Sequence, residues 1–117
     1  MVIVQGEIYW VDLDEPRGSE PGFRRPYVVV QNNPFNKSNI NTVVVCSLTS
    51  NIKLASAPGN VLLEKGEANI TKASVVNISQ IATINKTDLK EKIGQLPKEK
   101  IDKIIDGIDY LLKPREV

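Results

Sequence analysis

The sequence predicts a mainly β fold of the α+β class, in which a small, strongly curved and largely antiparallel sheet or barrel packs against one C-terminal helix. Short runs of β-forming residues fill most of the chain, and apolar residues with helical spacing appear only from Pro97 onward. Strands and helix are therefore segregated, which argues against a parallel sheet of β-α-β units. The length of 117 residues predicts a single domain over residues 1–117.

The expected strands are short runs rich in Val, Ile, Tyr and Thr. Three consecutive valines in the second run indicate burial on both faces or a place in a barrel wall. The last run indicates one bent strand or two short ones. In chain order the runs are residues 7–13 (EIYWVDL), 26–31 (PYVVVQ), 42–50 (TVVVCSLTS), 60–66 (NVLLEKG) and 73–84 (ASVVNISQIATI).

Two helices are expected near the C-terminus. Residues 87–96 (TDLKEKIGQL) indicate a short helix with Thr87 as its N-cap and Gly94 as its C-terminal stop. A longer amphipathic helix is expected between Pro97 and Pro114, because apolar residues recur there at three- and four-residue intervals. Gly107 lies inside this helix, where glycine costs about 1 kcal/mol relative to alanine, and so indicates close packing.

Composition narrows the possible functions. The net charge of +1 provides no global field for nucleic acid or membrane, so any anion site must be local. The chain has no histidine, which removes the commonest general base and transition-metal ligand. The single cysteine, Cys46, is expected to be a buried apolar residue. Neither a signal peptide nor a membrane-spanning run is apparent, so we expect a cytoplasmic protein without membrane contact.

A few polar residues could carry chemistry. Arg24 and Arg25 end a long loop, residues 14–25, and begin a strand; a guanidinium matches phosphate in a two-pronged geometry. They could equally be a solvated pair at a strand start. Thr49 belongs to a group of hydroxyls at the end of the third strand, and Gln80 lies between apolar residues. Each could bind a ligand or simply face solvent. No phosphate-binding loop and no metal-spaced carboxylate cluster is present.

Taken together, five segments resemble motifs of the MazF/PemK family of toxin endoribonucleases. Each motif is weak alone, but their order and separations match the family across nearly the whole chain. They are residues 6–13 (GEIYWVDL), 18–32 (GSEPGFRRPYVVVQN), 48–50 (LTS), 74–84 (SVVNISQIATI) and 89–96 (LKEKIGQL).

The resemblance implies an SH3-like barrel of the CcdB/PemK toxin kind and a homodimer. It also implies a toxin of a type II toxin–antitoxin system that cuts single-stranded messenger RNA at specific sequences, without a metal or other cofactor. A cognate MazE-like antitoxin would be its partner. The family's catalytic arginine, which directly precedes proline, falls on Arg25, and its catalytic hydroxyl falls on Thr49. The family's substrate contacts fall on Ser19 and Gln80.

The expected reaction uses the 2′-OH of RNA as nucleophile and leaves a 2′,3′-cyclic phosphate and a 5′-OH. Arg25 would stabilise the charge of the phosphorane and could donate a proton to the leaving oxygen. Thr49 would hydrogen-bond a non-bridging oxygen. Arg17 and Arg24 are expected around the phosphates. The base stays open between Glu20, a second loop residue and water.

One departure from the family pattern concerns specificity. Many relatives read E-Q-I-R-T in the late strand, where this chain has SQIAT, with Ser79 and Ala82 in place of the charged residues. The loop also carries Arg17 and a second proline, Pro21. We expect these changes to alter the RNA sequence recognised rather than the chemistry.

Two other functions remain compatible with such a barrel. A gyrase-inhibiting toxin of the CcdB kind would poison a protein target and would not need the arginines. A non-catalytic RNA-binding or structural barrel would use Arg25 only to position phosphate. The arginine–proline strand start and the Thr49 motif favour the ribonuclease over both.

Overall fold

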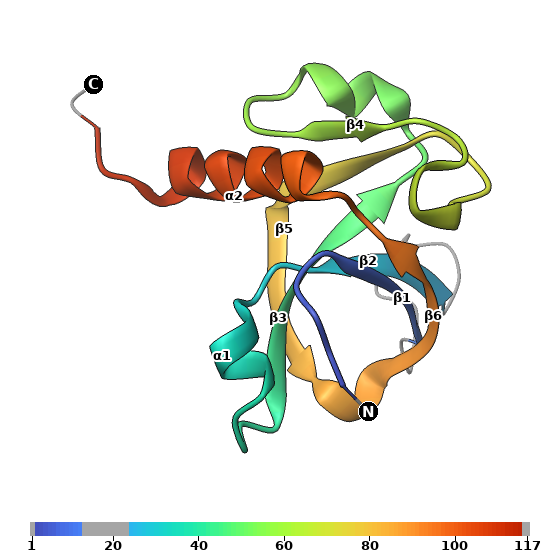
Figure 1. The fold of residues 1–117 in the computed structure, drawn as a ribbon. Coiled ribbons are helices and arrows are strands. Elements are labelled where there is room, and N and C mark those ends of the chain that lie inside the picture. Colours follow the sequence, from blue (N-terminus) through green and yellow to red (C-terminus); the bar gives the residue numbers. More distant parts are fainter. Residues whose placement is uncertain (1, 13–23, 116–117) are drawn as a thin grey trace.

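The computed structural model describes residues 2–12 and 24–115. Within these ranges, six strands form one curled sheet that resembles half of a barrel, and a helix crosses one of its faces (Figure 1). None of the helices there is long and apolar enough to cross a membrane. The prediction of a mainly β fold with a C-terminal helix is confirmed.

Every pair of neighbouring strands in the sheet is antiparallel. The strand order across the sheet is β4-β5-β3-β2-β1-β6, so the last strand pairs with the first. The strands are β1 (Glu7–Asp12), β2 (Arg24–Val29), β3 (Thr42–Thr49), β4 (Val61–Leu63), β5 (Ser74–Asn85) and β6 (Leu89–Gln95). The connections include the short helix α1 (Asn33–Asn36) and the 3₁₀ turns η1 (Ile52–Ser56), η2 (Glu67–Asn69) and η3 (Lys86–Asp88).

Apolar side chains fill both faces of the central strands. The valines that follow Pro26 illustrate this: Val28 and Val30 pack in one apolar cluster and Val29 in another. Because successive side chains of a strand point to opposite faces, a strand with three buried valines must be covered on both sides. The expectation for this run is therefore confirmed. Cys46 is also buried, as predicted, with no exposed surface.

Helix α2 (Lys98–Leu112) covers one of these clusters and packs against β4 and β5. It begins directly after Pro97 and ends before Pro114, as its sequence pattern predicts. A side chain at Gly107 would overlap the carbonyl oxygen of Gly59, so the close packing indicated by this glycine is also confirmed. The helix uses only part of its apolar stripe, because Leu111 and Leu112 remain exposed.

The expected short helix over residues 87–96 is wrong, because this segment is the edge strand β6. Leu89 and Ile93, four residues apart, imitate a helical face. Two register shifts against β1 each place an extra residue in β6, which removes the alternation that marks a strand. Gly94 does not end a helix: it lies where any side chain would overlap the backbone of Ala68.

Candidate active site

The predicted catalytic pair meets at one end of the sheet. Strand β2 begins beside Arg25 and its antiparallel neighbour β3 ends at Thr49. The strand register pairs Tyr27 with Ser47, and Arg25 and Thr49 each lie two residues beyond this pair, toward the same end of the sheet. Both side chains are half-buried. An antiparallel pair of strands thus brings Arg25 and Thr49 to the same end of the sheet on rigid backbone.

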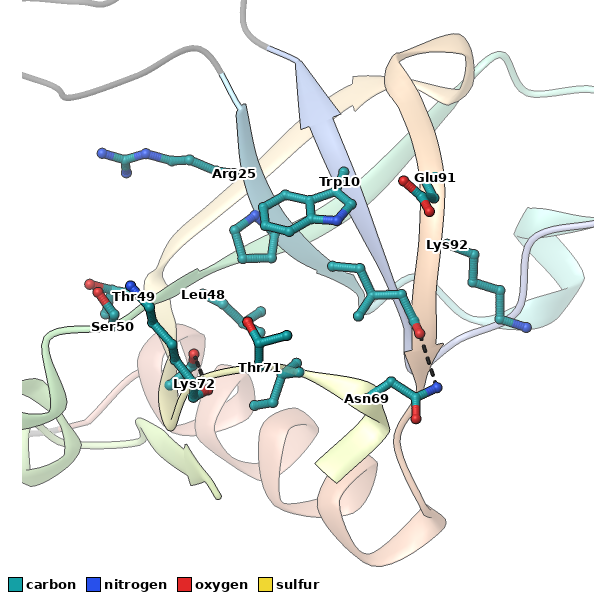
Figure 2. Close-up of a pocket in the computed structure, with 14 residues that line it drawn as sticks. Trp10, Arg25, Leu48, Thr49, Ser50, Asn69, Thr71, Lys72, Glu91 and Lys92 are labelled. Atoms are coloured by element: carbon teal, nitrogen blue, oxygen red, sulfur yellow. Dashed lines mark hydrogen bonds between the residues drawn. The ribbon is translucent and has the colours of Figure 1, made fainter. Parts of the chain in front are cut away.

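Two hollows flank this pair. The first, which we call the Trp10 pocket, has a volume of about 560 Å³. Its apolar wall includes the indole of Trp10, and its other lining residues are Arg25, Pro26, Leu48, Thr49, Ser50, Asn69, Ile70, Thr71, Lys72, Ser74, Glu91, Lys92 and Ile93. Figure 2 shows Arg25 and Thr49 at one end of the pocket and Glu91 at the other.

The second hollow, which we call the Gln80 groove, has a volume of about 480 Å³ and is also lined by Arg25 and Thr49. Gln80 lies in an irregular part of β5, where residues 78–80 are extra in the register against Cys46 and Ser47. Bulges of this kind redirect side chains and are frequent beside active sites. The structure therefore brings Arg25, Thr49 and Gln80 around one groove.

Arg25 and Thr49 each have a hydrogen-bond donor that an anionic ligand could use. Among the described residues, Arg25 has no carboxylate within ion-pair distance. The Thr49 hydroxyl oxygen accepts a hydrogen bond from the backbone N–H of Asn51 at 3.2 Å. A hydroxyl that accepts in this way keeps its own proton to donate. Together these groups offer a positive charge and an O–H donor at the same place.

Arg24 has a different environment from Arg25. Its guanidinium lies 3.2 Å from a carboxylate oxygen of Glu91 and 3.8 Å from one of Asp12. It also stacks over the indole of Trp10, with 5.0 Å between the guanidinium carbon and the ring centroid. Arg24 lines neither hollow. Its charge is thus engaged within the protein, on the edge formed by β1, β2 and β6.

A buried carboxylate supports the strands behind the Trp10 pocket. Glu7 is almost fully buried and accepts hydrogen bonds from the N–H of Val4 at 2.7 Å and the hydroxyl of Tyr9 at 2.9 Å. The ammonium of Lys92 lies 2.7 Å from its other oxygen. Burial, the hydrogen bond to Glu7 and the charge of Glu7 raise the pKa of the Tyr9 phenol. These contacts join β1 to β6, and the Lys92 ammonium points away from the pocket (Figure 2).

Three of the sequence-predicted site residues, Arg17, Ser19 and Glu20, lie outside the described residues. No group of three or more His, Cys, Asp or Glu side chains that could hold a metal ion occurs in the part of the chain that the structure describes. Burial raises the pKa of the Cys46 thiol to about 12, so this cysteine is not poised as a nucleophile.

Sequence reasoning missed the Trp10 pocket. The only tryptophan of the chain, in the middle of the first strand, was a usable signal. The opposite wall was not foreseeable, because Asn69 and Thr71 belong to a connection without a pattern, and Glu91 lies on the segment misassigned as a helix. Asn69 is held there by a 3.1 Å hydrogen bond from its amide to the carbonyl of Ile93.

The chain matches, over residues 4–112, the family described as the PemK-like, MazF-like toxin of type II toxin–antitoxin systems. Curated relatives include endoribonuclease MazF6 of Mycobacterium tuberculosis, which is 43% identical over 112 residues, covering 96% of this chain and 98% of the relative. Endoribonuclease MazF of Staphylococcus saprophyticus is 38% identical over 108 residues, covering 92% and 89%.

Solved structures share the fold. An endoribonuclease in complex with its cognate antitoxin from Mycobacterial species superposes with a TM-score of 0.77 over 97% of this chain and 99% of its own, at 23% identity. MazF from Deinococcus radiodurans gives a TM-score of 0.74 over 97% and 99%, at 22% identity. Both structures therefore have the same fold as this chain.

Proposed function

The chain belongs to the family of PemK-like, MazF-like toxins of type II toxin–antitoxin systems and is a toxin endoribonuclease, and from this premise we propose how it cuts its substrate. It cleaves single-stranded messenger RNA at a specific sequence, without a metal ion, by attack of the 2′-OH on the neighbouring phosphate. The products are a 2′,3′-cyclic phosphate and a 5′-OH. The observation that carries this proposal is the meeting of Arg25 and Thr49 between two hollows.

The chemistry needs little from the protein because RNA carries its own nucleophile. The 2′-oxygen must lose a proton, the extra charge of the phosphorane must be stabilised, and the leaving 5′-oxygen must gain a proton. Arg25 stabilises the charge on the non-bridging oxygens, since its guanidinium is not neutralised by any described carboxylate. It is also the donor proposed for the leaving oxygen.

Thr49 supplies a neutral hydrogen bond to the same phosphate. Its hydroxyl is oriented by the N–H of Asn51 and retains a proton to donate. Because β3 fixes the backbone of Thr49, this donor is preorganised and needs no rearrangement as charge develops. Gln80, exposed beside the same groove, is the proposed contact to an RNA base or sugar.

The proton acceptor for the 2′-OH is proposed to come from the residues between β1 and β2. Arginine rarely gives up its proton in proteins, which excludes Arg25 from this role. Glu20 is the preferred candidate, with a second residue of this segment or a water as the alternatives. Ser19 and Arg17 of the same segment are proposed to contact the substrate.

Two macromolecular partners complete the proposal. Related structures are described as complexes of the endoribonuclease or of MazF with a cognate antitoxin or with MazE, and we extend this to a MazE-like antitoxin for the present chain. A homodimer is proposed on the family's pattern. Sedimentation of the purified chain, alone and with a MazE-like antitoxin, tests both assemblies.

The mechanism is tested with a synthetic RNA that contains a mapped cleavage site. Replacing the single ribose 5′ of the cut with 2′-deoxyribose removes the nucleophile and should abolish cleavage, while the same replacement one nucleotide away should have little effect. Mass spectrometry of the normal products should show the 2′,3′-cyclic phosphate. Continued cutting of the 2′-deoxy substrate would contradict the proposed attack.

A further inference from the structure

We propose that the Trp10 pocket binds a nucleobase of the RNA, stacked on Trp10, and that Arg24 is a positioning residue that holds the indole for this stacking. The proposal rests on the proposed function, because it places the base beside the phosphate held by Arg25 and Thr49. It departs from the expectation that Arg24 itself contacts phosphate.

The pocket has the size and surface that a base requires. Its volume of about 560 Å³ lies within the range of small-molecule sites. The lining combines apolar side chains, among them Trp10, Leu48 and Ile70, with polar and charged ones. Single-stranded RNA is commonly bound by stacking its unpaired bases on aromatic side chains. An aromatic surface with hydrogen-bonding groups around it suits a base, which offers a flat apolar face and polar edges.

The indole of Trp10 is held by a guanidinium that does not itself line the pocket. Arg24 lies over the ring at 5.0 Å, whereas Arg24 is not part of the pocket lining. One face of the ring is covered by the guanidinium, and in the proposed arrangement a base takes the other face. A base stacked there would complete a layered arrangement of guanidinium, indole and base.

The charges around Arg24 explain why it acts through Trp10. Its ion pairs with Glu91 and Asp12 offset its own charge, although all three groups are about half exposed or more. A phosphate would have to compete with two carboxylates for this guanidinium. Arg25 faces no such competition among the described carboxylates. The two neighbouring arginines thus have different proposed roles: Arg25 binds the phosphate, and Arg24 positions the indole on which the base stacks.

The pocket shares Arg25 and Thr49 with the Gln80 groove, which fixes the position of the base in the RNA. A phosphate between these two residues leaves one flanking nucleotide for each hollow. The stacked base therefore belongs to a nucleotide directly beside the cut. This makes Trp10 a determinant of substrate binding that neither the arginine–proline motif nor the Thr49 motif includes.

A double-substitution experiment tests the stacking. The kcat/KM of the wild-type protein and of Trp10→Leu is measured on an RNA with a mapped cut and on two RNAs with an abasic residue on either side of it. We expect Trp10→Leu to reduce kcat/KM on the parent RNA by about 5- to 150-fold, the range of base–aromatic stacking. On one of the abasic RNAs the same substitution should cause little further loss, and Trp10→Phe should retain most activity.

An equal loss from Trp10→Leu on all three RNAs, or no loss on the parent RNA, would overturn the stacking. Because Trp10→Leu could fail to fold, the wild-type protein provides a second readout. Trp10 is the only tryptophan, so its fluorescence reports directly on the pocket. Uncleavable 2′-O-methyl RNA of the same sequence should quench it, and the abasic version should not. Quenching by both, or by neither, would also overturn the proposal.

These readouts separate the two proposals. If the wild-type protein cuts no RNA, the proposed function fails, while the fluorescence titration with 2′-O-methyl RNA still tests base stacking. If the protein cuts RNA and Trp10 fluorescence does not respond, only the stacking fails.

The role of Arg24 is tested by the salt dependence of binding to the 2′-O-methyl RNA. Each phosphate contact adds about 0.7 to the slope of log affinity against log salt for single strands. The charge-matched variant Arg24→Gln/Glu91→Gln should keep the wild-type slope and lose part of the fluorescence quenching. Arg25→Gln should lower the slope by about 0.7. A lower slope in the Arg24 variant, with quenching intact, would show a phosphate contact and overturn the positioning role.

Discussion

Arg25 on β2 and Thr49 on β3 line the same two hollows, one on each side of them. Strand pairing brings this about, since the start of β2 and the end of β3 lie at the same end of an antiparallel sheet. In the proposed mechanism, a phosphate between the two residues would meet a positive charge and a hydroxyl donor.

The hydroxyl of Thr49 is predicted to matter more than its shape. Thr49→Val keeps the volume but removes the donor, and should reduce the cleavage rate by about 10²- to 10³-fold, as removal of an oxyanion donor does. Thr49→Ser keeps the hydroxyl and should remain within about tenfold of wild type. Single-turnover cleavage of a synthetic RNA measures both, and a fully active valine variant would refute the role of the hydroxyl.

The ion pair between Glu7 and Lys92 is predicted to stabilise the edge of the sheet. Lys92→Met leaves the buried Glu7 carboxylate with only Val4 and Tyr9 as hydrogen-bond donors. The loss should be about 1–3 kcal/mol in the free energy of unfolding, below that of a fully buried pair because the lysine is half exposed. Urea unfolding measures it. The double variant Glu7→Gln/Lys92→Met, which also removes the unpaired charge, should recover part of the loss. An unchanged free energy of unfolding in Lys92→Met would contradict the stabilising role of the ion pair.

Gly107 is predicted to resist replacement although it lies inside a helix. Gly107→Ala should improve helix propensity by about 1 kcal/mol, but its side chain overlaps the carbonyl of Gly59. Overpacking of this kind costs about 1–3 kcal/mol, so the net change should be a lower melting temperature. Asp106→Ala, an exposed site on the same helix, serves as control. A gain in stability for Gly107→Ala comparable with that of the control would show that the contact is not tight.

Stability is predicted to fall at alkaline pH because of buried Cys46. Its pKa is about 12 in the folded protein, against an ordinary value of 9.0, because burial disfavours the thiolate. Below pH 9 the thiol is protonated in both states and costs nothing. Between pH 9 and 12 only the unfolded chain releases the proton, so stability should fall by about 1.4 kcal/mol per pH unit from this group.

Cys46→Ala should remove this part of the alkaline slope, whatever its effect on stability at neutral pH. Tyr9, whose pKa is also raised by burial, adds a similar loss above its ordinary value of 10.0, so the slope of the variant should be reduced rather than abolished. Urea unfolding at a series of pH values from 8 to 11 gives both slopes. Parallel curves for the two proteins would contradict the assignment to Cys46.

The sequence allowed most of the fold to be predicted because the strands are dense in β-formers and the final helix has a clear apolar period. The prediction was wrong for β6. Register shifts against β1 interrupt the alternation expected of a strand there, and Leu89 and Ile93 have the spacing of a helical face. Such shifts depend on pairing with a distant strand, and no local pattern encodes them.

The candidate site was also predictable only in part. Arg25 and Thr49 could be named from motifs, and the structure places them together with Gln80. The Trp10 pocket could not, because its far wall combines β6 with the connection around Asn69, and these meet only in the folded chain. The different roles of Arg24 and Arg25 also depend on which carboxylates the fold brings near each of them.

The most direct test of the central claim is cleavage of a long single-stranded RNA in excess EDTA by the wild-type protein, Arg25→Ala and Arg25→Lys, with the RNA ends mapped. We predict discrete cuts with 5′-OH ends for the wild type and a loss of cutting by at least about 10²-fold in Arg25→Ala. Arg25→Lys should retain part of the activity, because it keeps the charge but not the two-pronged geometry of the guanidinium. Comparison of melting curves confirms that the variants fold. Abolition of wild-type cutting by EDTA, or full cutting by a folded Arg25→Ala, would contradict the central claim.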